Sequence, residues 1–209
     1  MSGQQPGLFV VIEGPSGVGK TTVTAMLRDE LTRRGYLVTA TNEPTDTPLG
    51  KLARQGTDEY RGMILACLVT ADRYHHLEHD IRPALRAGHV VLCDRYVPTS
   101  LVLQRIDGVE PSFLAQLNQY ADQPDLTIVL TGDPGRSQQR AAGRGTYSRF
   151  HRGGTAARVV EDRLYRDVVH RLREAGQAVL HHEVKQESAI AVTASILDIV
   201  LERLGQPSA

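Results

Sequence analysis

Several kinds of residue are scarce in this chain of 209 residues, and each shortage excludes a class of protein. There is no tryptophan, and the three phenylalanines and seven tyrosines form no stacking platform of the kind that binds single-stranded nucleic acid. The two cysteines, Cys67 and Cys93, stand in apolar surroundings without a paired spacing. We therefore expect buried thiols in a reduced compartment and no disulfide framework.

A net charge and long apolar runs are also missing. Lysine plus arginine equals aspartate plus glutamate at 24 each, so no overall field favours nucleic acid or an anionic membrane. No apolar run approaches the roughly 20 residues of a membrane span, and the polar segment 1–7 lacks the pattern of a secretory signal. These absences lead us to expect a soluble cytoplasmic protein with neither nucleic acid nor a membrane as partner.

What the chain does contain is a phosphate-binding loop directly after an apolar run. Gly14, Gly19, Lys20 and Thr21 fit the pattern G-x-x-x-x-G-K-[ST] before a helix-capable stretch. The glycines let backbone N–H groups converge on phosphates, while Lys20 reaches the β- and γ-phosphates and Thr21 is placed to ligate Mg²⁺. The sequence therefore predicts binding of ATP with Mg²⁺. The loop residues expected to hold the triphosphate are Gly14, Ser16, Gly17, Val18, Gly19, Lys20, Thr21 and Thr22.

Short apolar segments alternate with helical stretches along the rest of the chain. Segments 37–41, 89–93 and 126–130 are rich in valine, isoleucine or leucine and predict buried parallel strands, and 177–181 is a weaker candidate. Hairpin signals are few. This alternation predicts an α/β fold, a parallel sheet with helices on both faces, in a single domain that covers 1–209.

A second polar motif follows the apolar segment 90–93. Asp94, at the end of the predicted strand, resembles the carboxylate that holds magnesium-bound water near the phosphates in phosphate-loop proteins. A helix cap or a strand-end ion pair is the simpler interpretation, but the phosphate loop upstream favours the metal role. Arg95 beside it supplies a fork-shaped donor for the phosphate of an acceptor.

An arginine and three histidines share one long helical stretch. Taken alone, Arg73 is best interpreted as a charge on a solvated helix face. His75 and His79 are four residues apart and could hold a metal, but no third ligand is evident. We therefore expect His75, His76 and His79 to be surface residues.

The segment 140–158 is unusual in composition: with Arg136 just before it, there are six arginines, beside four glycines and few apolar side chains. We expect a mobile, arginine-bearing loop within the domain. A linker is excluded because strand-like and helical segments follow it.

In order and spacing, these motifs resemble those of bacterial thymidylate kinases over roughly residues 8–170. The shared motifs are the phosphate loop, Glu43-Pro44, Ala71-Asp72-Arg73, the segment 81–85, Asp94-Arg95-Tyr96, Ser100, Gln104 and the segment 124–126. The resemblance implies a phosphate-loop nucleotide kinase fold with a five-stranded parallel sheet flanked by helices and a lid. It also implies transfer of the ATP γ-phosphate to dTMP, giving dTDP, by a homodimer.

The resemblance assigns roles to individual residues on the acceptor side. It implies that Arg95 binds the acceptor phosphate and that Arg73 donates a hydrogen bond to a thymine carbonyl. Ser100 and Gln104 are expected along the base, where Gln104 can read its polar edge. Glu43 is expected near the acceptor.

On the donor side, the resemblance places an arginine-rich lid at 136–156, whose arginines close over the triphosphate and exclude water. Arg140 is expected to help hold ATP. The implied catalytic residues are Lys20, Asp94, Arg95, Arg144 and Arg149, and the implied metal ligands are Thr21 and Asp94.

Four positions depart from the family pattern, all on the acceptor side. Ser16 replaces an acidic residue of the phosphate loop, and Asn42 replaces an arginine. Val69 replaces a phenylalanine that stacks on the base, and Leu103 replaces a tyrosine that lies against the sugar. Both aliphatic residues are still expected to line the substrate site.

These departures keep an alternative open, a related kinase repurposed for a modified nucleotide or a secondary metabolite. A non-catalytic nucleotide-binding module is disfavoured because Lys20, Thr21 and Asp94 are all present. A nucleic-acid-dependent ATPase is disfavoured by the zero net charge.

Overall fold

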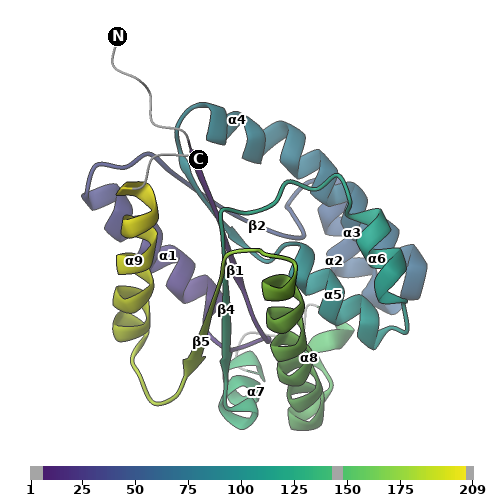
Figure 1. Ribbon diagram of the computed structural model, residues 1–209. Helices are drawn as coiled ribbons and strands as arrows, with labels where there is room; N and C mark the ends of the chain where they lie inside the picture. Colours follow the sequence, from purple (N-terminus) through teal and green to yellow (C-terminus); the bar gives the residue numbers. More distant parts are fainter. Residues whose placement is uncertain (1–6, 143–147, 206–209) are drawn as a thin grey trace.

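The computed structural model describes residues 7–142 and 148–205, and its centre is a parallel sheet (Figure 1). The sheet has five strands in the order β2-β3-β1-β4-β5, with β1 in the middle. The five-stranded parallel sheet expected from the sequence is therefore confirmed. The strands are β1 (Leu8–Glu13), β2 (Val38–Asn42), β3 (Val90–Asp94), β4 (Leu126–Gly132) and β5 (Val179–Val184).

Helices cover both faces of the sheet because alternate residues of each strand point in opposite directions. On one face, Val10 and Ile12 of β1 pack in a cluster with buried residues of helices α1 (Lys20–Arg33) and α9 (Ala189–Gly205). On the other face, Phe9 and Val11 pack with residues from the end of the long α3–α4 region. All six residues of β1 are buried, as a central strand between two helical layers requires.

The remaining helices lie mostly on the side of Phe9 and Val11, where they build the walls of the site. They are α2 (Pro48–Gln55), α3 (Gly62–His76), α4 (Arg82–Arg86), α5 (Val97–Ile106), α6 (Pro111–Leu117), α7 (Pro134–Ala142) and α8 (Gly154–Glu174). A π-helical turn, Leu77–Ile81, joins α3 to α4, and 3₁₀ turns form at Gly56–Asp58 and Arg149–His151. Within the described ranges, no helix has both the length and the apolarity needed to cross a membrane.

The register of the sheet brings the sequence motifs to one edge. Ile12 of β1 and Asn42 of β2 both pair with Asp94 of β3, so the three strands end side by side. From β1 the chain reaches β2 and β3 on one side, while β4 and β5 lie on the other. Ligands of open α/β sheets bind in the crevice at the carboxyl ends of strands where the connections diverge in this way.

Three expectations about individual segments are wrong. Cys67 is exposed on α3, and only Cys93 is buried. His76 is fully buried, because it lies on the face of α3 that meets the sheet. The loop expected at 140–158 is helical at both ends, because 140–142 finish α7 and 154–158 begin α8, where alanines support a helix; residues 143–147 lie outside the described ranges.

Candidate active site

The phosphate loop between β1 and α1 takes a shape that only its glycines allow. Gly14 and Gly17 have φ of 138° and 84°, in the region that L side chains rarely adopt. A Cβ atom on Gly14 would lie 2.1 Å from the Leu130 carbonyl oxygen, and one on Gly17 would lie 2.0 Å from that of Ser137. The loop therefore packs directly against β4 and α7, and its position is set by its own sequence.

Lys20 stands at the start of α1 and folds back over this loop. Its Nζ donates hydrogen bonds to the carbonyl oxygens of Gly14 at 2.8 Å and Pro15 at 3.0 Å, and the residue is buried. Burial, aided by the positive charge of Arg95, lowers the pKa of Lys20 to about 8, although nearby carboxylates oppose the shift. Since burial disfavours the charged form of Lys20, a bound anion such as a phosphate would stabilise it.

Thr21 and Asp94 meet across the end of the sheet. The Thr21 hydroxyl donates to Oδ2 of Asp94 at 2.7 Å, while Oδ1 of Asp94 is buried without a partner among the described residues. A hydroxyl beside a carboxylate with a free oxygen is the hard oxygen donor set that Mg²⁺ prefers. The two residues predicted as metal ligands are thus brought together and fit that ion.

Arg95 joins the donor and acceptor sides of the site. Among the described residues it is the one non-glycine residue with positive φ, at 77°, a backbone conformation that is costly for any L residue with a side chain. Its guanidinium donates to Ser16 Oγ, Thr99 Oγ1 and the Tyr165 hydroxyl, each at 3.2 Å. Burial would lower the pKa of Arg95, but Tyr165 and surrounding carboxylates outweigh it and raise the pKa, so the charge is permanent.

Two buried glutamates that the sequence analysis did not identify support this arrangement. Glu13 accepts from the Tyr96 backbone N–H at 2.7 Å and from the Thr99 hydroxyl at 2.7 Å, and burial raises its pKa. Glu161 of α8 accepts from the Ser16 backbone N–H at 3.1 Å. Glu13 was detectable as a charge inside an apolar strand, directly before Gly14. No sequence pattern indicated Glu161, because Ser16, its partner in the phosphate loop, is 145 positions away.

A cavity of about 490 Å³ extends from this point toward α3 and α5. One end is lined by Thr21, Asp94 and Arg95, and the other end by Arg73 and Gln104. With Glu43, Val69 and Leu103, eight of the predicted site residues line this single space, although the chain separates them by up to 83 positions. A small phosphorylated molecule that spans the cavity would have its phosphate beside Arg95 and its far end beside Arg73.

At the far end of the cavity, a group of buried polar side chains surrounds Arg73. Nε of Arg73 donates to Glu43 at 2.8 Å, and Nη1 and Nη2 donate to the Ser100 hydroxyl at 3.2 Å. Asn118, directly after α6, accepts a further hydrogen bond from Nη1 at 2.5 Å, a partner that sequence reasoning missed. Arg73 is 1% exposed, so the interpretation of this arginine as a solvated charge is wrong.

Gln104 lies in the same end with one unused hydrogen-bonding atom. The residue is buried, lines the cavity, and its Oε1 has no partner within the described part of the chain. A buried acceptor without a donor is costly and is rare in native proteins. This oxygen therefore marks where a ligand donor would be bound.

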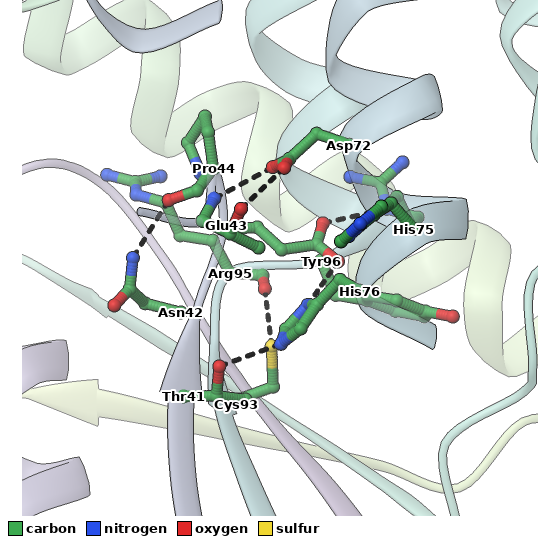
Figure 2. Close-up of polar contacts among 12 residues, drawn as sticks. Thr41, Asn42, Glu43, Pro44, Asp72, His75, His76, Cys93, Arg95 and Tyr96 are labelled. Atoms are coloured by element: carbon green, nitrogen blue, oxygen red, sulfur yellow. Dashed lines mark hydrogen bonds and ion pairs between the residues drawn. The ribbon is translucent and has the colours of Figure 1, made fainter. Parts of the chain in front are cut away.

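A second group of polar side chains, Thr41, Glu43, His76 and Cys93, connects β2 and β3 to α3. Figure 2 shows His76 between Thr41 and Glu43, with ring nitrogens 2.7 Å from the threonine hydroxyl and 3.2 Å from the carboxylate. The side chains of Glu43, His76 and Cys93 lie close enough together to share a metal ion. The Cys93 thiol, however, already donates to the Arg95 carbonyl at 3.0 Å. The cluster holds Glu43 in place, and each of its members has a protein partner.

The four positions that depart from the family pattern border the same space. Asn42, Val69 and Leu103 line the cavity directly, and Ser16 reaches it through its hydrogen bond to Arg95. The Asn42 side chain donates to the Pro44 carbonyl at 2.9 Å. The expectation that Val69 and Leu103 line this site agrees with their positions.

The arginines predicted for the lid lie apart from one another. Arg149 forms a two-pronged pair with Asp107, including a contact of 2.6 Å, and its Nε donates to the Thr57 carbonyl. It therefore lies on the acceptor side, and a catalytic role would require this pair to open. Arg140 is exposed on α7 and borders a separate hollow beside Thr22. Arg144 lies outside the described residues.

Comparison with known proteins agrees with this geometry. The family model described as thymidylate kinase matches residues 12–188. A probable thymidylate kinase of Caldivirga maquilingensis is 37% identical over 159 residues, which cover 74% of this chain and 78% of the relative. Those of Pyrococcus horikoshii and Pyrobaculum aerophilum are 40% and 32% identical, covering 69% and 92% of this chain and 74% and 97% of the relatives.

Each of these relatives carries the same name, so the hypothesis of a repurposed kinase gains no support from them. The matched region includes the phosphate loop from Gly14, Asp94, Arg95 and the whole acceptor cavity. This chain belongs to the thymidylate kinase family and is an enzyme of the nucleoside monophosphate kinase class.

Proposed function

We propose that this enzyme transfers the γ-phosphate of ATP to dTMP, with release of dTDP and ADP. The observation that carries the proposal is the single cavity that joins Thr21, Asp94 and Arg95 at one end to Arg73 and Gln104 at the other. A nucleoside monophosphate has the matching polarity, with an anionic phosphate at one end and a hydrogen-bonding base at the other.

The buried end of the cavity matches the edge of thymine. That edge presents one N–H donor between two carbonyl acceptors. Gln104 offers an unpaired Oε1 for the N–H, and the described hydrogen bonds of Arg73 leave one N–H of Nη2 for a carbonyl. A site whose buried polar groups need these partners discriminates strongly against ligands that lack them.

At the other end, positive charge meets the phosphates. Arg95 would bind the acceptor phosphate, a role supported by its position in the cavity lining and by its hydrogen bonds to Ser16 and Thr99. Lys20 would leave the Gly14 and Pro15 carbonyls for the β- and γ-phosphates. Both cations stabilise the negative charge that spreads over the transferred group, which is the main catalytic requirement of phosphoryl transfer.

Thr21 and Asp94 would hold Mg²⁺, which neutralises charge between the β- and γ-phosphates when bound. A hollow of about 180 Å³ on the outer side of the loop is lined by Thr22, Arg140 and Glu187, among others. We assign this hollow to the nucleoside part of ATP. Arg140, with Arg144 and Arg149, would then complete the lid as the triphosphate binds.

We also propose that the enzyme acts as a cytoplasmic homodimer. Helix α3 exposes Met63 and Ile64, each about 60% accessible, with Cys67 and Ala71 one and two turns further along the same face. An apolar stripe of this kind is typical of a surface that another protein covers. An exposed thiol in it is compatible with a reducing compartment. Light scattering of the wild type and of Ile64→Glu tests the dimer, and two monomeric results would contradict it.

The acceptor is tested by coupled ADP release with dTMP, dUMP, dCMP and dGMP. We expect the highest kcat/KM for dTMP. Gln104→Leu keeps the volume but removes the acceptor oxygen, and we expect it to lower kcat/KM for dTMP about 10-fold or more while the KM for ATP stays constant. Turnover of another monophosphate in preference to dTMP would overturn the assignment.

A further inference from the structure

The base end of the cavity has lost the aromatic residues expected at 69 and 103, yet aromatic rings still border it. Val69 and Leu103 supply aliphatic surface. Two aromatic residues, Tyr96 and Phe150, line the cavity among the residues that the structure describes. A base has two apolar faces, so the question is which ring can lie against one of them.

Tyr96 is not available for this purpose. The residue is 1% exposed, its hydroxyl donates to the Asp122 carbonyl at 3.0 Å, and the Arg73 guanidinium lies 5.1 Å from its ring centroid. The rings of Phe9 and Tyr96 also pack edge to face, with their centroids 5.2 Å apart. Tyr96 is thus a fixed support for Arg73.

Phe150 occupies a different position. It comes from the 3₁₀ turn before α8 and packs against buried Ala53, Leu65 and Val69 of α2 and α3. It is therefore next to the residue that replaces the stacking phenylalanine of the family pattern. The Arg149 guanidinium lies 4.3 Å from its ring centroid, and Phe150 is itself one of the residues that line the cavity.

The turn that carries Phe150 is fixed at several points. Arg149 pairs with both oxygens of Asp107, and its backbone N–H donates to the Thr57 hydroxyl at 3.2 Å. The carbonyl of Phe150 accepts from the buried guanidinium of Arg158. Because these contacts already hold the turn to other parts of the fold, the Phe150 ring loses little conformational freedom when a ligand binds against it.

We propose that Phe150 stacks on the acceptor base and replaces, from a segment far along the chain, the aromatic surface missing at Val69 and Leu103. Arg149 lies on the far face of the ring and holds it through Asp107. Phe150 is thus a specificity-determining residue for planar acceptors. The inference rests on the proposed function, because it requires a base in this end of the cavity.

The absence of tryptophan allows a direct optical test. Phe150→Trp creates a protein with one tryptophan, and a base that stacks on an indole quenches its fluorescence. We expect a saturable loss of emission with dTMP but none with deoxyribose 5-phosphate, which has the same phosphate and no base. Phe113→Trp, in the cluster around Leu114 outside the cavity, is the matched control and should show no loss.

Steady-state kinetics provides the second test. Phe150→Leu keeps an apolar side chain in the cluster and removes only the aromatic face. We expect the KM for dTMP to rise about 10-fold, within the range measured for base–aromatic stacking, while the KM for ATP changes less than about twofold. Adding Val69→Phe to Phe150→Leu returns a ring to the neighbouring position, and we expect the double variant to recover most of the loss in affinity for dTMP.

The outcomes separate this inference from the proposed function. If the wild type phosphorylates dTMP but Phe150→Leu keeps its KM and Phe150→Trp is not quenched, the stacking role is wrong and the function stands. If the wild type shows no turnover of dTMP, the proposed function itself is wrong. A parallel rise in the KM for dTMP and ATP would point to general loosening of the α2–α3 wall and would also overturn the stacking role.

Discussion

The two ends of the active site are built in different ways. The phosphate-binding part of the donor end is nearly continuous in sequence, since residues 14–22 form it together with Asp94 from β3. The acceptor end is assembled from β2, α2, α3, α5 and the turn before α8. Phosphate binding depends on backbone geometry, which a short motif determines. Recognition of a base depends on side chains that only the finished fold brings together.

The ends also differ in how their charges are balanced. At the acceptor end, Arg73 already has Glu43 as counter-ion at 2.8 Å. At the donor end, the pKa of Lys20 is lowered by burial and Asp94 has an unpaired oxygen, so both residues gain when a nucleotide and its metal bind. The charges of the acceptor end are thus paired before binding, whereas those of the donor end gain their partners from the ligand.

Lys20→Ala tests the donor end and should have the largest effect. It removes the one cation that reaches the β- and γ-phosphates from the loop, and we expect kcat to fall about 10³-fold with any acceptor. The thermal unfolding temperature of the variant should stay close to that of the wild type, because the substitution removes a buried charge whose desolvation is itself unfavourable. Lys51→Ala, an exposed lysine on α2, is the matched control and should keep full activity.

Arg73→Met tests whether the acceptor end is organised in advance. The variant leaves Glu43 buried without its main counter-ion, so we expect the free energy of unfolding to fall by about 3 kcal/mol. Adding Glu43→Gln removes the unpaired charge and should restore part of the stability but not dTMP turnover. Denaturant unfolding measures both effects. Equal stabilities for the single and double variants would contradict this view of the pair.

Arg95→Ala tests the junction between the two ends. We expect kcat/KM for dTMP to fall about 100-fold, mostly through a higher KM, because a charged hydrogen-bond partner of the acceptor phosphate is lost. The affinity for ATP should change little. An unchanged KM for dTMP would contradict the proposal that Arg95 binds the acceptor phosphate.

The pH dependence of ATP binding gives the smallest and most specific effect. Below its pKa of about 8 Lys20 is charged, and above it the neutral amine no longer attracts the triphosphate. Since bound phosphate favours the protonated form, the Kd for ATP should rise up to about tenfold per pH unit above pH 8. Calorimetry in buffers of different ionisation enthalpy should also detect proton uptake. The affinity for dTMP should stay nearly constant there, because Arg95 remains charged.

The parts of the structure that follow from local rules were predictable from the sequence. The predicted strands appear within a few residues of their expected ends, and Thr21 and Asp94 meet because the strands before them are adjacent and parallel. The resemblance to a known family correctly implied the five strands and the kinase class. The roles of individual residues remain predictions that the proposed experiments address.

What the sequence concealed depends on contacts between distant segments. Arg73 and His76 lie on a helix with polar and charged residues around it, so nothing local indicates that both are buried. Their burial depends on Glu43, which lies about 30 positions earlier and supplies the hydrogen bonds that such burial requires. Phe150 carries no pattern at all, because its neighbours in space are on α2 and α3.

The buried pair of Arg73 and Glu43 has a consequence for how this site can change over generations. Each residue is the counter-ion of the other inside the protein, so replacing either one alone leaves a buried, unpaired charge. The two replacements are therefore strongly coupled, and either single change lowers stability more than both together. Apolar positions such as Val69 and Leu103 carry no such constraint, and a ring can be regained elsewhere. Divergence of the acceptor site in this lineage is therefore expected to proceed through its aliphatic and aromatic walls, while the ionic pair is inherited as one unit.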